Sequence, residues 1–479
     1  MTDSWFAALI PAACVTAAAL AAMVVEAFRD RHEHPPIGLL GTIGLVAALA
    51  ACVVLWDRNQ VSFGMIQADN FGLFASMIVL VAALLTVALS APAIERERLP
   101  AGDYYAVMLF AVVGMVLMAM AIDLLMIFLA LEILSIGVYV LTGMRRDRVA
   151  SSEGAFKYFL LGAFSSAFFL YGVALTYVLT GTTRLDRIGA YMAAEAMNTT
   201  PLMLIALAML LVGFAFKISA VPFHMWTPDA YEGAPAIVTG FMSTAVKAAA
   251  FAAFVRVFLS ALEPLQGDWA PVLWVIAMLT MILGTVVGVA QSNLKRMLAY
   301  SSIAHAGYLL VGLIAANEVG KAGILFYLLV YAVSNLGAFG VIVLMATRES
   351  PRDELGDYTG LWHVRPGLAA LMTVFLLSLG GLPPTAGFVA KWYVFSAAVR
   401  AGYYELAIVG LLTSVVSVFF YLRVVVMMYM AEPAAQPARP AAGVLAMSAL
   451  AVSTAAVFYL GILPTRVLDL AAASVGTIF

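Results

Sequence analysis

Charged residues are scarce in this 479-residue sequence: Asp, Glu, Lys and Arg together make up 11% of it, whereas 64% of its residues are hydrophobic. The formal net charge of −2 at pH 7 gives no indication of nucleic acid or another polyanionic partner. So little charge, with a mean hydropathy of +1.02, is typical of an integral membrane protein.

Cysteine is almost absent as well, since Cys14 and Cys52 are the only two and both fall in apolar runs. Two isolated thiols are too few for an iron–sulfur cluster or a zinc site, and they do not suggest a disulfide framework. The sequence also lacks a glycine-rich phosphate loop and a nucleotide-binding fingerprint. We therefore expect no redox cofactor, nucleotide or metal in this chain.

What the sequence has instead is a series of long apolar runs separated by short turns. A helix needs about 20 apolar residues to cross a bilayer, and the sequence predicts an all-α polytopic membrane protein. We expect the first span to be retained, because the preceding MTDSW lacks the basic residues of a signal peptide. The fourteen predicted spans are at about 5–28, 37–56, 71–91, 104–122, 124–143, 154–180, 201–222, 233–260, 271–290, 296–316, 321–346, 366–399, 402–430 and 441–463.

Basic residues are distributed unequally between alternate loops. Loops after even-numbered spans carry five: Arg58, Arg184, Arg187, Lys321 and Arg400. Loops after odd-numbered spans carry thirteen: Arg29, Arg31, Arg96, Arg98, Arg145, Arg146, Arg148, Lys295, Arg296, Arg348, Arg352, Arg365 and Arg439. The positive-inside rule then places the odd loops in the cytoplasm and both termini on the periplasmic side. The longest loops, about 181–200 and 347–365, have room for at most a small helix.

Two of the spans contain residues that break a helix. Span seven runs GFAFKISAVPFHMWTPDAYEGAP and span twelve runs SLGGLPPTAGFVAKWYVF, each with a lysine, proline and small residues. Broken helices in two halves of a chain are typical of an ion pathway at the bilayer midplane, and Arg256 and Arg423 also occupy comparable positions. We predict two inverted five-helix repeats, 104–260 and 261–430, preceded by three spans in 1–103 and followed by one span and a tail in 431–479.

Ions of both signs lie inside these apolar segments. Four of the six lysines are there, together with one acid, although a charge near a bilayer centre costs at least ~2.5–3.5 kcal/mol. The five residues are Glu132, Lys157, Lys217, Lys247 and Lys391. Their retention in so apolar a sequence indicates proton or cation transport.

Glu132 lies in LLMIFLALEILSIGVYVLTG, where Ser135 and Tyr139 share its helix face and form a polar stripe. The functional interpretation is an acid whose protonation responds to a nearby lysine. A protonated structural acid bonded to a neighbouring helix is the alternative.

Three of the lysines lie deep within their spans. Lys217 follows sixteen residues without a charge, and a small and polar stripe of Gly240, Ser243 and Thr244 leads to Lys247. Lys391 follows a break whose free backbone groups must face protein or water. We interpret the three as proton sites; the alternatives are a static ion pair at Lys217, close helix packing at Lys247 and snorkelling at Lys391.

Three further residues have weaker patterns. Lys157 lies four residues after Glu153 near the end of a span, where a snorkelling lysine is ordinary. His224 follows the break in span seven, and His305 shares a helix face with Ser301 and Tyr308. A second stripe carries Tyr327, Tyr331, Ser334 and Asn335 on the next span. Such stripes can order a chain of waters, although single histidines are commonly core residues.

The alternation of acid and lysine suggests how a proton could be moved. Burial disfavours the charged form of a lysine, whereas a nearby carboxylate favours it. If Glu132 moved away from Lys217, the proton would be released toward Lys247 and then Lys391. At an effective dielectric near 20, charges ~8 Å apart interact by about 2 kcal/mol, which is enough to bias the transfer.

The motifs VPFHMWTPDAYEGAP, LAYSSIAHAGYLL and SLGGLPPTAGFVAKWYVF resemble the antiporter-like membrane subunits of respiratory complex I, especially the N type of bacterial NADH–quinone oxidoreductase. The resemblance covers roughly 104–430. It implies fourteen spans, two inverted repeats and broken seventh and twelfth helices. A lysine rather than a glutamate in span twelve favours the N type over the M type, and the lack of a long C-terminal amphipathic helix argues against the L type.

Residue by residue, the family's span-five glutamate matches Glu132. The lysines of its spans six, seven, eight and twelve match Lys157, Lys217, Lys247 and Lys391. The resemblance implies a multi-pass subunit of the bacterial inner membrane that translocates protons. NADH oxidation and quinone reduction in partner subunits would drive it, with FMN and iron–sulfur clusters held there. Its expected partners are other membrane subunits of complex I, lipid, protons and internal water.

Other functions fit the same pattern. A subunit of an Mrp-type cation/proton antiporter shares the core, as do hydrogenase-linked and ferredoxin-linked relatives. A passive membrane scaffold, whose ions only lock helices together, is the alternative from a different class. The proteins that copurify with the chain, and proton pumping by lysine variants, separate these possibilities.

Overall fold

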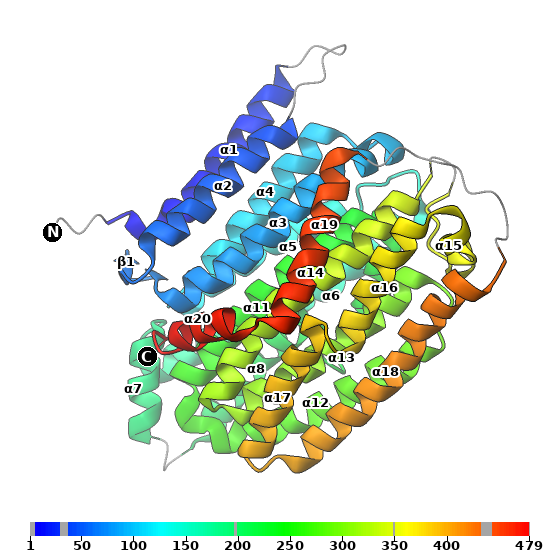
Figure 1. Ribbon diagram of the computed structural model, residues 1–479. Coiled ribbons are helices and arrows are strands. Elements are labelled where there is room, and N and C mark those ends of the chain that lie inside the picture. The colour runs from blue at the N-terminus through cyan, green and yellow to red at the C-terminus, as the bar shows by residue number, and fades with distance from the viewer. Residues whose placement is uncertain (1–4, 29–36, 196–198, 348–349, 433–442, 479) are drawn as a thin grey trace.

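The computed structural model describes residues 5–28, 37–195, 199–347, 350–432 and 443–478 as a bundle of helices (Figure 1). The described residues include one short hairpin, β1 (Gln60–Ser62) and β2 (Ile66–Ala68). The predicted loop residues Arg29, Arg31, Arg348 and Arg439 lie outside the described ranges. The all-α polytopic class is confirmed.

Twelve helical segments in the described part are long and apolar enough to cross a membrane. They are α1 (Ile10–Ala27, with η1 before it), α2 (Ile37–Leu55), α3 (Asn70–Glu97), α4 (Ala101–Met120), α5 (Leu124–Thr142), α6 (Val149–Thr180), α10 to η4 (Ala236–Ala261), α12 (Gln266–Val289, with η5 before it), α13 (Leu294–Ala315), α14 (Glu318–Met345), α18 (Tyr404–Met430) and α19 (Val444–Ile462). Two shorter apolar helices, α8 (Pro201–Lys217) and α16 (Pro366–Gly380), fall in predicted spans seven and twelve. The total of fourteen crossings stays a prediction.

Both predicted breaks are present. The chain turns between α8 and α9 (Trp226–Gly233), and between α16 and α17 (Ala386–Arg400), at segments that contain Pro222 and Pro384. Proline lacks the amide hydrogen that a continuous helix requires, and Gly381 adopts a φ of 83°, which favours glycine. The two breaks differ in one respect: Lys217 is the last residue before the first break, whereas Lys391 follows the second.

Predicted span eight is continuous but irregular, which the sequence analysis did not foresee. Here α10 (Ala236–Phe241) leads into a π-helical segment, η3 (Met242–Val246), followed by α11 (Lys247–Arg256) and a second π-helical segment, η4 (Val257–Ala261). Ser243 Oγ and Thr244 Oγ1 donate hydrogen bonds to the carbonyl of Gly240 at 2.9 and 2.8 Å, and such bonds perturb a helix locally. π-Helical turns frequently occur at functional sites.

The connecting segments meet at the two ends of the bundle as the alternation of spans requires. Short backbone bridges link Ile66 with Ala121 and Asp123 with Arg184, which joins three even-numbered loops at one end. At the other end, Asn293 pairs with Glu354, which joins two odd-numbered loops. The membrane side on which each end lies remains a prediction.

The two halves repeat several local features. Asp123 caps the N-terminus of α5 and pairs with Arg184, while Asn293 caps α13 and pairs with Glu354 at the same separation along the chain. These correspondences agree with a repeat, although the boundaries 104–260 and 261–430 stay predictions.

The two arginines predicted to be equivalent also behave alike. Arg256 Nη2 donates to the carbonyl of Ala119 at the end of α4, at 3.4 Å. Arg423 Nη1 donates to the carbonyl of Val289 at the end of α12, at 3.0 Å. Each arginine therefore binds the C-terminal end of the first helix of its half.

Several short helices lie outside the spans. The loop 181–200 contains one small helix, α7 (Leu185–Glu195), as predicted, whereas the loop 347–365 contains two short ones, η6 (Leu355–Tyr358) and α15 (Leu361–Val364), where at most one was expected. The predicted tail contains a helix that was not expected, α20 (Thr465–Val475). It packs against α3 and α14 near the C-terminus (Figure 1).

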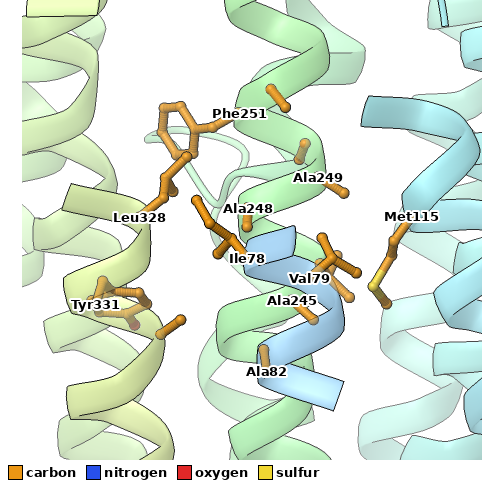
Figure 2. Close-up of a cluster of buried hydrophobic side chains, with 14 of the residues drawn as sticks. Ile78, Val79, Ala82, Met115, Ala245, Ala248, Ala249, Phe251, Leu328 and Tyr331 are labelled. Carbon is orange, nitrogen blue, oxygen red and sulfur yellow. The ribbon is translucent and has the colours of Figure 1, made fainter. Parts of the chain in front are cut away.

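The centre of the bundle is packed with small and apolar side chains. Figure 2 shows Val79 of α3 beside Ala245, Ala248 and Ala249 of η3 and α11, with Met115 of α4 on the other side. Small residues allow neighbouring helices to approach closely in a membrane protein. This packing holds the segment that carries Lys247 in a fixed position.

Candidate functional site

Three of the predicted lysines are buried inside the chain. Lys217, Lys247 and Lys391 have exposed fractions of 3%, 2% and 5%. None of the three forms an ion pair within the part of the chain that the structure describes. Their contacts are hydroxyl groups, carbonyl groups and aromatic rings.

Lys217 lies at the break between α8 and α9. Its Nζ donates to Ser135 Oγ of α5 at 2.7 Å and to Tyr158 OH of α6 at 3.5 Å. The ring of Tyr139 lies 5.8 Å from the same nitrogen, within range of a cation–π interaction. The sequence placed Ser135 and Tyr139 on one face with Glu132, and the structure brings two of these three residues to Lys217.

Glu132 lies one turn from Ser135 and is only half-buried. Its Oε1 accepts a hydrogen bond from Ser166 Oγ of α6 at 2.5 Å. It forms no ion pair with Lys217 among the described residues, but it is close enough to attract that lysine electrostatically. A small cavity is lined by Lys217, by Ser135 and by Ser166, the serine that binds Glu132.

Lys247 is the first residue after the π-helical segment η3. Its Nζ donates to the carbonyl oxygen of Ser302 on α13 at 2.5 Å and to Ser302 Oγ at 2.6 Å. The ring of Tyr331 on α14 lies 5.6 Å away. Lys247 therefore connects predicted span eight with the helices of the second half.

His305 lies between two of the buried lysines. Its Nδ1 pairs with Tyr327 OH at 2.6 Å, its Nε2 with Tyr421 OH at 3.4 Å, and both Lys247 and Lys391 act on it electrostatically. The predicted stripe of Ser301, His305 and Tyr308 also faces this group, because Ser301 hydrogen-bonds to Tyr421. A neutral imidazole has one donor and one acceptor nitrogen and can pass a proton between neighbours.

Lys391 ends the row. Its Nζ donates to the carbonyl of Gly380 at 2.8 Å and to Ser414 Oγ of α18 at 2.8 Å. Gly380 is the last residue of α16, so the break supplies a carbonyl that no longer has a helical partner. The ring of Tyr308 lies 5.2 Å from the lysine and connects it with α13.

Lys157 has a different environment. Its side chain is 43% exposed, and its Nζ pairs with Glu153 at 2.7 Å and with Asp229 of α9 at 2.8 Å. The other oxygen of Asp229 binds Arg296 of α13 at 2.8 Å. The structure therefore places Lys157 in a surface ion-pair network that links the two halves, apart from the buried lysines.

His224 lies in the turn between α8 and α9 and is half-buried. Its Nδ1 has no hydrogen-bond partner among the described residues. Among the described residues it forms no hydrogen bond with any of the lysines described above, so its role remains a prediction.

Several residues of the site were not identified from the sequence. They are Ser166, Ser302, Tyr158, Tyr421, Ser414 and Asp229. Adjacent serines in apolar helices, at 165–166 and 301–302, were a signal that could have found two of them. The others become partners only through contacts between distant helices.

A membrane-spanning bundle with interrupted helices and a row of buried lysines, hydroxyls and an imidazole defines a class of protein that transfers protons or cations. A family model described as the NADH:quinone oxidoreductase/Mrp antiporter transmembrane region matches residues 121–417. The chain belongs to this family, and within it to the relatives named subunit N of NADH-quinone oxidoreductase.

Two curated relatives illustrate the similarity. Subunit N of Trichlorobacter lovleyi is 48% identical over 422 residues, covering 88% of this chain and 87% of the relative. Subunit N 2 of Rhizobium meliloti is 43% identical over 471 residues, covering 98% and 97%.

Solved structures agree in fold. A chain of respiratory complex I from Thermus thermophilus with bound aureothin is 36% identical, with a TM-score of 0.82 over 96% of this chain and 99% of that one. A chain of the Mrp complex from Dietzia sp. has a TM-score of 0.85 over 100% and 98%, but at 21% identity it shows the fold alone.

Proposed function

We propose that this chain is a proton-translocating membrane subunit of a bacterial NADH–quinone oxidoreductase. The observation that carries the proposal is the row Lys247, His305 and Lys391, whose members are buried, each hydrogen-bonded to a hydroxyl group and free of carboxylate contacts among the described residues. A static ion-pair scaffold would be expected to pair its buried lysines with acids. The naming of the relatives as subunit N supports the same conclusion.

The proton enters the row at the Lys217 site. Glu132 favours the charged form of Lys217 as long as the carboxylate is near and ionised. When a partner subunit draws Glu132 away or neutralises it, Lys217 releases its proton toward Lys247. Ser135 holds the Lys217 ammonium in place by accepting its hydrogen bond.

The second half then passes the proton on. Lys247 is held by Ser302 on α13, the helix that also carries His305. His305 exchanges its proton with the hydroxyl groups of Tyr327 and Tyr421, and Lys391 is the last site of the row. Internal water completes the gaps between these groups.

The chain works with partners. We propose that NADH oxidation and quinone reduction take place in other subunits, which hold FMN, iron–sulfur clusters and quinone, and that this chain holds no cofactor or metal. It contacts other membrane subunits and lipid in the bacterial inner membrane. Both termini then lie on the periplasmic side.

Purification of the intact assembly tests the proposal. A tagged chain should copurify with flavin and iron–sulfur proteins, and Lys217→Ala and Lys247→Ala should lose NADH-driven pumping at normal subunit content. An Mrp-type antiporter subunit, with which the chain shares its fold, would instead copurify with small membrane subunits alone. A passive scaffold would keep pumping in both variants.

A further inference from the structure

A polar hollow opens at the end of the bundle where the even-numbered loops meet. It has a volume of about 510 Å³, and its lining comes from the β1–β2 hairpin, the turn at Ile122, α7, the end of predicted span eight and the C-terminal segment. Polar side chains line it, including Asn59, Gln67, Ser260 and Thr477. None of these residues belongs to the lysine row.

The lining carries little net charge. Arg184 Nη2 pairs with Asp186 at 2.7 Å. Arg256, the other cation in the lining, pairs with Asp69. A neutral, polar hollow has no excess charge with which to select a charged metabolite, but it suits water.

Arg256 is the most buried charged residue of the lining, so its pair with Asp69 forms the floor of the hollow. Arg256 Nη1 and Nη2 donate to the two carboxylate oxygens of Asp69 at 2.6 and 2.7 Å, and the side chains are 2% and 0% exposed. Asp69 also caps α3 by accepting a hydrogen bond from the amide of Gly72 at 2.8 Å. Arg256 Nε has no partner among the described residues, so a polar solvent molecule is needed to satisfy it.

A dry segment lies beyond the floor. Arg256 is the last residue of α11 and Lys247 is the first, so at 1.5 Å per residue they are separated by about 13 Å. The residues between them are alanine, phenylalanine and valine, all of them buried. Ala248 and Ala249 pack against α3 in Figure 2, which leaves no polar group of α11 between the two charges.

We propose that this hollow is an aqueous vestibule beside the proton route from Lys217 to Lys391, and that the Arg256–Asp69 pair is the gate at its floor. The pair keeps bulk water from reaching α11 and Lys247 while the proton is held in the row. The ligand class is water and hydronium. The inference rests on the proposed function. In that function Arg256 is a positioning residue, because it acts through its ion pair with Asp69.

Thiol labelling of the assembled complex tests the vestibule. The test uses a chain whose Cys14 and Cys52 are replaced by alanine. The thiol introduced by Ser260→Cys lies in the hollow, and the thiol introduced by Ala252→Cys lies behind the floor. A membrane-impermeant methanethiosulfonate reagent should modify Ser260→Cys from one side of oriented vesicles, at least about tenfold faster than Ala252→Cys, because the thiolate needs water to react. Equal rates, or no reaction at Ser260→Cys, would overturn the vestibule.

The gate is tested in the Ala252→Cys background. Arg256→Ala should raise labelling of that thiol by about tenfold and make vesicles leak protons, whereas Arg256→Lys should keep it protected, since one ammonium still pairs with Asp69. If Arg256→Ala does not assemble, Arg256→Gln with Asp69→Asn removes both charges at similar size. Unchanged labelling in the assembled variant would refute the gate.

Labelling reports water access whether or not the chain pumps. Loss of the proposed function would appear as normal pumping in Lys247→Ala, whereas failure of the vestibule would appear in the Ser260 and Ala252 rates. The two results are therefore distinguishable.

Discussion

The two halves of this chain hold the lysine beside each helix break in different ways. In the first half, Lys217 has an acid nearby, because Glu132 is one turn from the serine that binds the lysine. In the second half, Lys391 has hydroxyl and carbonyl partners and no carboxylate contact among the described residues. A carboxylate therefore acts on the first site, whereas hydroxyl and carbonyl groups surround the second.

The position of Glu132 supports this difference. It is half-buried and turned toward α6, where Ser166 binds it. Glu132 is therefore less enclosed than Lys217, Lys247 and Lys391, which are all buried.

The two broken helices also differ in where their lysines find hydrogen-bond partners. Lys217 ends the helix before the first break and reaches other helices, α5 and α6, for its partners. Lys391 lies in α17, after the second break, and binds the carbonyl of Gly380 at the end of α16, which the break leaves free. The second site is thus partly fixed by the other part of the same broken span, whereas the first depends on neighbouring spans.

The largest effect is expected from Lys247→Ala, which interrupts the connection between the halves. Loss of a positioned proton carrier should reduce NADH-driven pumping by at least about tenfold, measured as proton uptake per assembled complex. Lys321→Ala is the matched control, since Lys321 is also a lysine within a helix but lies beside Glu318 at the start of α14. Equal loss in both variants would contradict the relay.

Glu132→Ala should come next. Removal of the carboxylate takes away its electrostatic attraction for the Lys217 ammonium, so pumping should fall severalfold while subunit content stays near normal. Glu132→Asp should restore part of the activity. If Glu132→Ala pumps normally at normal subunit content, the first half is not switched by this acid.

A smaller loss is expected from changes around His305. Tyr327→Phe removes the hydroxyl that pairs with Nδ1 at 2.6 Å, whereas Tyr421→Phe removes a longer contact of 3.4 Å to Nε2. Since a short hydrogen bond is the stronger of the two, pumping should fall more in Tyr327→Phe. The reverse order would show that the proton leaves His305 through Tyr421.

The smallest effect is expected from Lys157→Gln. This lysine is 43% exposed and its partners Glu153 and Asp229 are at the surface, where ion pairs contribute little. Pumping should change by about twofold at most, measured beside Lys217→Gln as the buried counterpart. A loss as large as that of Lys217→Gln would assign Lys157 to the relay, as the family resemblance implies.

Sequence patterns were sufficient where neighbours along the chain decide the structure. The face shared by Glu132, Ser135 and Tyr139 follows from the helical period, and the breaks near Pro222 and Pro384 follow from the chemistry of proline. The placement of alternate loops at opposite ends of the bundle could also be predicted, because each apolar run must cross the bilayer.

Hydrogen-bond and ion-pair partners on distant helices could not be predicted from the sequence. Ser302 binds Lys247 across 55 positions of sequence, and Tyr421 reaches His305 across 116. The Arg256–Asp69 pair joins residues 187 positions apart. No local period encodes such contacts.

The sequence by itself determined that this protein is a helical membrane protein with ionisable groups inside its spans. Long apolar runs with few charges are stable in a bilayer as helices, whose backbone groups are hydrogen-bonded within the segment. The tertiary structure decided which of those charges form a row, which stay at the surface and which close the end of the bundle. Each of these outcomes depends on distances between helices far apart in the chain, and only packing sets those distances.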